Sequence, residues 1–192
     1  MLSNFEILNN ESGKVEFFDN KIVIDANPAT DCYISPYSEY NRFNAFYLYK
    51  KIKTNFIVSV LIKPDFKETY DAGCLVIYKN SKKYIKFCFE KTDLGYPAVV
   101  SVITNDRSDD CNGIEIKDSQ IWLRVVRKNS TFGLYYSFDG INWFMHRLLN
   151  FLFDDELFVG IQSQSPAGNG CKSEFFNFEI ENKEVTNLKK GI

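Results

Sequence analysis

Short runs of alternating apolar and polar residues, each bounded by Asn, Asp, Gly or Pro, recur along the whole chain. This repetition is typical of a β-sandwich or barrel and differs from the alternation of strands and helices in α/β proteins. It predicts eleven strands and no long helix. These strands are expected at 21–26, 45–50, 55–63, 74–78, 84–90, 98–105, 121–128, 131–138, 142–147, 157–164 and 173–181.

The clearest local signal is a hairpin at 133–143. Asp139-Gly140 supplies the positive backbone angles that a tight turn needs, so the strands on either side are predicted to pair in antiparallel fashion. Alternation also predicts which side chains face the core. Ile85, Phe87 and Phe89 should point inward and Lys86 and Glu90 outward.

Composition supports one all-β domain of residues 1–192, with a polar tail at about 183–192 that is expected to fray. The 18 Phe and 11 Tyr suit a half-buried pleated surface. The net charge of −2 gives no positive field for nucleic acid, and no apolar stretch is long enough to span a bilayer. Five widely spaced cysteines and no apparent leader segment favour reduced thiols and a cytoplasmic location.

From about Thr30 onward, motifs spread over most of the chain resemble those of the domain of unknown function family 1349, a branch of the concanavalin A-like superfamily. The matching segments are Thr30-Asp31, Tyr70-Asp71, Ile85-Lys86 with Glu90, 101–104 with Ser108-Asp109, 122–125, 136–140 with Trp143 and Arg147, Val159-Gly160, 165–170 and 175–178. The resemblance implies a two-sheet antiparallel β-sandwich of the concanavalin A-like jelly-roll type. It also implies lectin-like carbohydrate binding, and some relatives are linked to regulation of enolase.

The resemblance and the strand pattern together nominate one candidate site on the outer, concave face. Its residues are Lys86, Glu90, Trp122, Arg124 and Tyr135. Charged and hydroxyl groups would hydrogen-bond to sugar hydroxyls, and aromatic rings would stack on the apolar faces of pyranose rings. The alternative for Lys86, Glu90 and Arg124 is an exposed cross-strand ion network.

Other chemistry has little support in the sequence. No catalytic triad surrounds the single histidine, His146, and no cofactor or metal motif is present. The acidic segment 105–113 lacks calcium-loop spacing and is interpreted as a turn.

The leading hypothesis is therefore a non-catalytic domain that binds a glycan or small polyol. A protein-interaction or regulatory module of carbohydrate metabolism is the alternative, and a glycoside hydrolase is a weaker one because no pair of facing carboxylates is evident.

Overall fold

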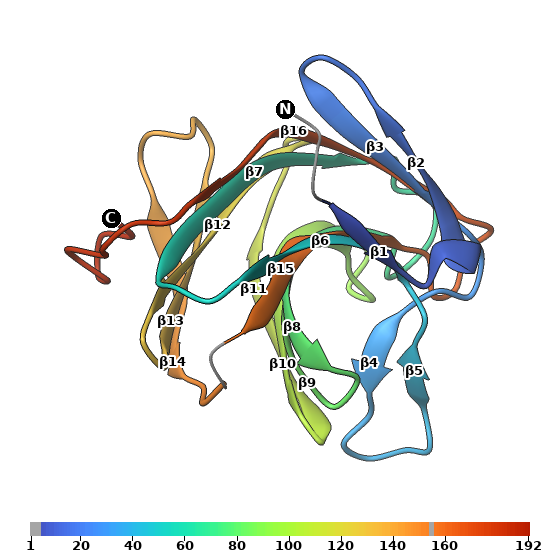
Figure 1. The fold of residues 1–192 in the computed structure, drawn as a ribbon. Helices are drawn as coiled ribbons and strands as arrows, with labels where there is room; N and C mark the ends of the chain where they lie inside the picture. Colours follow the sequence, from blue (N-terminus) through green and yellow to red (C-terminus); the bar gives the residue numbers. More distant parts are fainter. Residues whose placement is uncertain (1–4, 154–155) are drawn as a thin grey trace.

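The computed structural model describes residues 5–153 and 156–192, and it consists of two stacked seven-stranded antiparallel sheets with a small two-stranded hairpin beside them (Figure 1). Sheet 1 has the order β1 (Glu6–Leu8), β6 (Phe46–Ile52), β15 (Leu157–Gln164), β8 (Ala72–Asn80), β9 (Lys83–Lys91), β10 (Pro97–Asn105) and β11 (Arg107–Glu115). Sheet 2 has the order β14 (Phe144–Asn150), β13 (Thr131–Ser137), β12 (Ile121–Lys128), β7 (Phe56–Pro64), β16 (Cys171–Glu181), β3 (Lys21–Ala26) and β2 (Gly13–Phe17). The expected all-β, two-sheet sandwich is confirmed.

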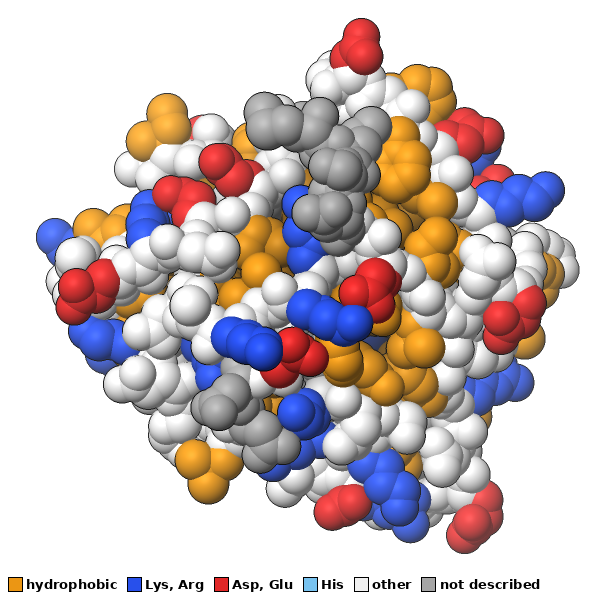
Figure 2. Space-filling view, in the orientation of Figure 1, with side chains coloured by type: hydrophobic (Ala, Val, Ile, Leu, Met, Phe, Trp, Pro, Cys, Tyr) orange, Lys and Arg blue, Asp and Glu red, His pale blue; other side chains and the backbone are white. Residues whose placement is uncertain are grey.

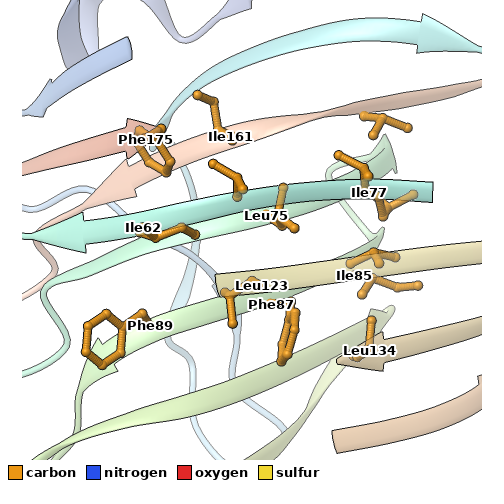
Figure 3. Packing of buried hydrophobic residues seen from close by; sticks show 14 of the residues in the cluster. Ile62, Leu75, Ile77, Ile85, Phe87, Phe89, Leu123, Leu134, Ile161 and Phe175 are labelled. Carbon is orange, nitrogen blue, oxygen red and sulfur yellow. The ribbon is translucent and has the colours of Figure 1, made fainter. Parts of the chain in front are cut away.

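The main core lies between the two sheets and follows the predicted alternation. Ile85, Phe87 and Phe89 on β9 face Leu123 on β12 and Leu134 on β13, and all five are buried (Figure 3). Each side chain of this size contributes about 1.5–3 kcal/mol when it leaves water. Because the period of a strand is two, the residues between them must point to the outer face, where a second apolar layer forms around Cys74, Cys88 and Val100.

The β4–β5 hairpin, formed by β4 (Cys32–Ile34) and β5 (Asn41–Phe43), extends from the sandwich beside the outer face of sheet 1 (Figure 1). It is attached to β11 by two hydrogen bonds. The Ile34 amide donates to Ser108 Oγ at 3.0 Å, and the Arg107 guanidinium donates to the Ser35 carbonyl at 3.1 Å. The hairpin therefore forms a wall next to β9, β10 and β11.

Two predictions about polar segments were wrong. Segment 105–113 is mostly the edge strand β11, which pairs with β10 from Ala98↔Glu115 to Asn105↔Arg107. Its polar sequence carries no burial pattern because nearly all of its side chains are exposed. The tail after β16 does not extend into solvent: Val185 is fully buried and packs with Ile57, Val126 and Tyr135.

The hairpin around Asp139-Gly140 is confirmed as an antiparallel pair, β13 with β14, but its connection is longer than a two-residue turn. Residues 138–143 form the loop, and only Gly140 has a positive φ angle, 75°. The Asp139 carboxylate accepts hydrogen bonds from the Ile141 and Asn142 amides, each at 2.8 Å. The side chain of Asp139 thus closes a turn that the dipeptide alone was expected to make.

No helix in the described part of the chain is long and apolar enough to cross a membrane. On the face seen in Figure 2, acidic and basic side chains are interspersed, with apolar side chains between them, and no broad region of one charge stands out. This agrees with the small net charge of −2.

Candidate functional site

A cavity of about 970 Å³ opens on the outer face of sheet 1, between its strands and the β4–β5 hairpin. This size is in the range of pockets that hold small organic ligands. We call it the tyrosine pocket, after four tyrosines in its wall. It is lined by Asp31, Tyr33, Ser35, Pro36, Tyr37, Ser38, Tyr40, Tyr70, Lys86, Glu90, Asp93, Val102, Ser108, Asp109, Asp110, Asn112, Gln164, Pro166 and Ala167.

Lys86 lies at the floor of the tyrosine pocket and is only 2% exposed. Its Nζ donates hydrogen bonds to Asp31 Oδ1 at 3.1 Å and to Gln164 Oε1 at 3.0 Å. Burial alone would lower the pKa of Lys86, but the charge of the adjacent Asp31 carboxylate opposes burial, and the pKa is raised well above its ordinary value. Lys86 is therefore a fixed ammonium group at all physiological pH values.

Asp31 is held in place from several directions. Its Oδ1 accepts the Cys32 amide at 2.7 Å, and its Oδ2 accepts the Tyr40 hydroxyl at 3.0 Å. Its own amide donates to Asn44 Oδ1 at 2.9 Å, which ties the start of β4 to the end of β5. Because buried ion pairs persist only where their remaining hydrogen-bonding capacity is satisfied, this network explains why the charged pair can exist at the floor.

Glu90 follows Lys86 by four positions, or two strand periods, on the same outer face of β9, and it is 7% exposed. Burial raises its pKa to about 8; Lys86 opposes this rise, while Asp110, Asp31 and Asp93 add to it. Asp110 on β11 responds in the same direction, since desolvation in the pocket raises its pKa. Glu90 is thus mostly a neutral carboxylic acid at pH 7, able to donate as well as to accept a hydrogen bond.

The wall of the tyrosine pocket is aromatic. Tyr33 and Tyr40 come from the β4–β5 hairpin, with ring centroids 6.3 Å apart, and Tyr37 lies at its tip, 88% exposed. Tyr70 stands on the other side, in the loop before β8, with a positive φ angle of 69°. Flat rings around a polar floor suit a ligand that has both apolar faces and several hydroxyl groups.

The structure brings together only two of the five predicted site residues. Lys86 and Glu90 line the tyrosine pocket, whereas Trp122, Arg124 and Tyr135 belong to β12 and β13 of the other sheet. The prediction that all five share one face was wrong, because alternation tells which residues point outward but not from which of the two sheets.

The face around Arg124 and Tyr135 is covered by the chain's own C-terminal segment (Figure 1). Arg124 donates to the Gly191 carbonyl at 3.2 Å, and its guanidinium lies 3.8 Å from the centre of the Trp143 ring. The Tyr135 hydroxyl donates to the Leu188 carbonyl, and Tyr135 is fully buried. A ligand could reach these two side chains only by displacing the segment 185–191.

Several pocket residues were not recognised as site residues from the sequence, although Asp31 and Tyr70 stand in motifs that carried the family resemblance. Gln164 ends β15, and the tyrosines of the β4–β5 hairpin stand in a Ser- and Pro-containing segment. The sequence feature that could have indicated the pocket is the presence of three tyrosines, Tyr33, Tyr37 and Tyr40, within eight residues. A solvated loop does not require so many aromatic side chains.

Among the described residues, no group of three or more His, Cys, Asp or Glu side chains is arranged to hold a metal ion. His146 lies away from the tyrosine pocket, where its Nε2 is 2.9 Å from Ser101 Oγ and its ring packs on Phe87. Burial lowers the pKa of His146 to about 4, so it is a neutral packing residue at pH 7.

Comparison with known proteins identifies a matching family and structures with a similar fold. Residues 8–183 match the model of a family described as "Protein of unknown function (DUF1349)". A functionally unknown protein from Saccharomyces cerevisiae has a similar structure, with a TM-score of 0.88, 22% identity, and coverage of 96% of this chain and 99% of that one. None of the curated proteins matches in sequence.

Two further solved structures share the sandwich at lower similarity. The GH43 BlXynB protein from Bacillus licheniformis gives a TM-score of 0.67 at 11% identity, covering 95% of this chain but 40% of that one. The exoplasmic/lumenal domain of VIP36, in a Ca²⁺/Man3GlcNAc-bound form, gives 0.56 at 8% identity, covering 97% of this chain and 87% of that one. At these identities the likeness establishes the fold alone.

Proposed function

Because the chain belongs to the DUF1349 family, whose description assigns no function, we propose a function from its own pocket: non-catalytic binding of a carbohydrate or small polyol. The observation that carries the proposal is the tyrosine pocket itself, in which the Lys86 ammonium and the Glu90 carboxyl form the floor and tyrosines form the wall. The same sandwich occurs in the Man3GlcNAc-bound domain of VIP36 and within the GH43 BlXynB protein, which supports the choice of ligand class.

The floor offers complementary hydrogen-bonding groups in a small area. The Lys86 ammonium has three donors, two of which are used by Asp31 and Gln164. The neutral Glu90 carboxyl offers one donor and one acceptor, and Asn112 offers an amide at the rim. Sugar hydroxyls, which both donate and accept, match such a mixture better than a purely apolar or a purely anionic ligand does.

Isothermal titration of neutral monosaccharides, disaccharides and polyols tests the proposal. At least one ligand should bind, and Tyr37→Ala should weaken it about fivefold, because an aromatic contact contributes about 1 kcal/mol. Tyr37 is suited to this test because its exposure means that its loss should leave folding intact. Trp122→Ala, on the outer face of the other sheet, is the matched control and should leave the affinity unchanged.

If no sugar or polyol binds, the proposed function is wrong. If binding is abolished by Trp122→Ala and retained by Tyr37→Ala, the ligand site lies on sheet 2 and not in the tyrosine pocket. The protein is also assayed for release of a free sugar from aryl glycosides. If it releases the sugar and Glu90→Gln abolishes the release, the protein is a glycoside hydrolase that uses Glu90 as its general acid, and not a binding domain.

A protein-interaction or regulatory module is the second candidate, and the edge of sheet 2 favours it. Large apolar side chains are exposed on β14 and its flanking loops: Phe138, Ile141, Phe144, Met145, Leu148 and Leu152. An edge strand with such side chains is able to accept another strand. Sedimentation of the protein with and without Leu148→Lys would reveal self-association through this edge, and a monomer in both cases would remove that form of the second candidate.

A further inference from the structure

The tyrosine pocket carries more negative charge than its single cation can balance. Lys86 is the only Lys or Arg among its lining residues, and its ammonium is already paired with Asp31. Asp109 is paired with Arg147 at 3.0 Å. Three carboxyl groups, Glu90, Asp93 and Asp110, then remain at the lining with no ion pair in the described part of the chain.

Glu90 is the most informative of the three. It lines the cavity, it is more than nine-tenths buried, and no donor among the described residues makes a hydrogen bond to its carboxyl group. Its oxygens are not among the fully enclosed polar atoms that lack a partner, so they are reached from the cavity. A largely desolvated carboxyl group that no donor of the chain occupies is available to a partner that enters the cavity. The ionisable groups that act on Glu90 are Lys86, Asp31, Asp93 and Asp110, three of which are acidic.

The aromatic wall suits the same kind of partner. The faces of Tyr rings carry partial negative charge and attract cations, and cation recognition sites commonly combine several such rings with a carboxylate. Tyr33, Tyr37, Tyr40 and Tyr70 surround the acidic floor of the pocket. The Arg42 guanidinium, which is not among the lining residues, lies 5.2 Å from the centre of the Tyr40 ring.

We propose that the ligand of the tyrosine pocket carries an ammonium group, as amino sugars do, and that this group pairs with Glu90 while the hydroxyls bind the Lys86 side of the floor. The inference rests on the proposed function, because it names a subclass of the same polyol ligands. It also gives Glu90, Asp93 and Asp110 a common role, which a neutral sugar does not require.

Pairing with an ammonium group changes the protonation of Glu90. In the free protein burial and the nearby acids raise its pKa to about 8, so the carboxyl group holds a proton near neutral pH. An adjacent cation favours the carboxylate, so the proton is released to solvent as the ion pair forms. Binding of an amino sugar should therefore release up to one proton, whereas binding of an uncharged sugar should release none.

The experiment uses matched sugars that differ only at one substituent: glucosamine, N-acetylglucosamine and glucose, and the corresponding galactose and mannose sets. Affinities are measured by titration calorimetry with the full chain at pH 6.5, in two buffers of different ionisation enthalpy so that proton release is counted. We expect an amino sugar to bind at least about tenfold more tightly than both of its uncharged counterparts, with proton release. Glu90→Gln should reduce this preference to less than about twofold.

Glu179→Gln, the same chemical change at an exposed position of β16 on the other sheet, is the control and should change nothing. Asp93→Asn, at an exposed position of the pocket, should also reduce the preference, and it keeps the test decisive if Glu90→Gln does not fold. If uncharged sugars bind as well as amino sugars, the inference is wrong and the proposed function stands. If no sugar of any set binds, the proposed function fails and the inference fails with it.

Discussion

Lys86 on β9 and Asp31 at the start of β4 form an ion pair of 3.1 Å in which both side chains are almost fully buried. The pair joins sheet 1 to the β4–β5 hairpin, and it is extended by Gln164 on one side and by Tyr40 on the other. The floor of the tyrosine pocket is therefore also the attachment point of one of its walls.

Lys86→Met should be strongly destabilising because it leaves Asp31 as a buried charge without its partner. Removal of one partner from a buried pair costs about 3–5 kcal/mol, while the pair as a whole contributes much less. The double variant Lys86→Met/Asp31→Asn should recover part of the loss. Urea unfolding of the three proteins measures both effects.

The exposed pair between Lys51 and Glu6, 2.8 Å apart, provides the matched control for that experiment. Lys51→Met should cost much less than Lys86→Met, since both side chains are solvated and the interaction is screened. Equal losses from Lys86→Met and Lys51→Met would show that burial of the Lys86–Asp31 pair has no energetic significance.

Glu90 should make the protein less stable as the pH rises. Its pKa is about 8 in the folded chain against 4.5 for a solvated Glu, so between these values the folded chain binds more protons than the unfolded chain. The free energy of unfolding then falls with increasing pH in this window and levels off above it, by up to about 1.4 kcal/mol per pH unit.

Glu90→Gln lacks this titration, so its stability relative to the wild type should increase steadily from pH 5.5 to pH 7.5. Urea unfolding at several pH values measures the difference. Glu179→Gln, at an exposed position of β16, is the control for the chemical change itself. A constant difference for Glu90→Gln would mean that Glu90 is ionised in the folded protein.

The sequence predicted the buried strands well because burial produces a pattern. Lys21–Ala26, Ile121–Lys128 and Leu157–Gln164 were predicted with the bounds that the structure shows. Five strands were not predicted from the sequence: β1, β2, β4, β5 and β11. They are short or polar strands that lie at the edges of the two large sheets or in the small hairpin. An edge strand is held by backbone hydrogen bonds from one side, so its side chains need not alternate.

The candidate site could be predicted only in part, for a geometric reason. Outward-facing positions such as Lys86 and Arg124 look alike in sequence, and only the pairing of β9 with sheet 1 and of β12 with sheet 2 separates them. The pairing of Lys86 with Asp31 spans 55 positions. No local spacing rule reports such a contact.

The C-terminal segment should contribute to stability through Val185, which is fully buried against Tyr135 and Val126. Val185→Ala removes about two buried methylene equivalents and should cost about 1.6 kcal/mol, at about 0.8 kcal/mol for each. Leu152→Ala, at a side chain that is 68% exposed, is the control and should cost less than about 0.5 kcal/mol. If Val185→Ala were as neutral as the control, the segment would not be docked in solution.

The thiols should differ sharply in reactivity although all five are reduced. Cys111 lies exposed on β11, whereas Cys32, Cys74, Cys88 and Cys171 are buried. Burial raises the pKa of Cys32 and of Cys171 to about 12 and that of Cys88 well above its usual value, so these groups are neutral thiols and poor nucleophiles. Even Cys74 and Cys88, a cross-strand pair with sulfurs 3.2 Å apart, are inaccessible to a reagent in solution.

Titration of the native protein with an aromatic disulfide reagent should therefore detect one fast thiol, and titration in denaturant should detect five. Cys111→Ser should remove the fast thiol and leave four in denaturant. Three thiols instead of five in the denatured wild type without reductant would indicate that Cys74 and Cys88 had joined in a disulfide. A second fast thiol in the native state would mean that one of the four buried sites opens. Cys32, the first residue of β4 in the hairpin wall, would be the first to examine by its own Ser variant.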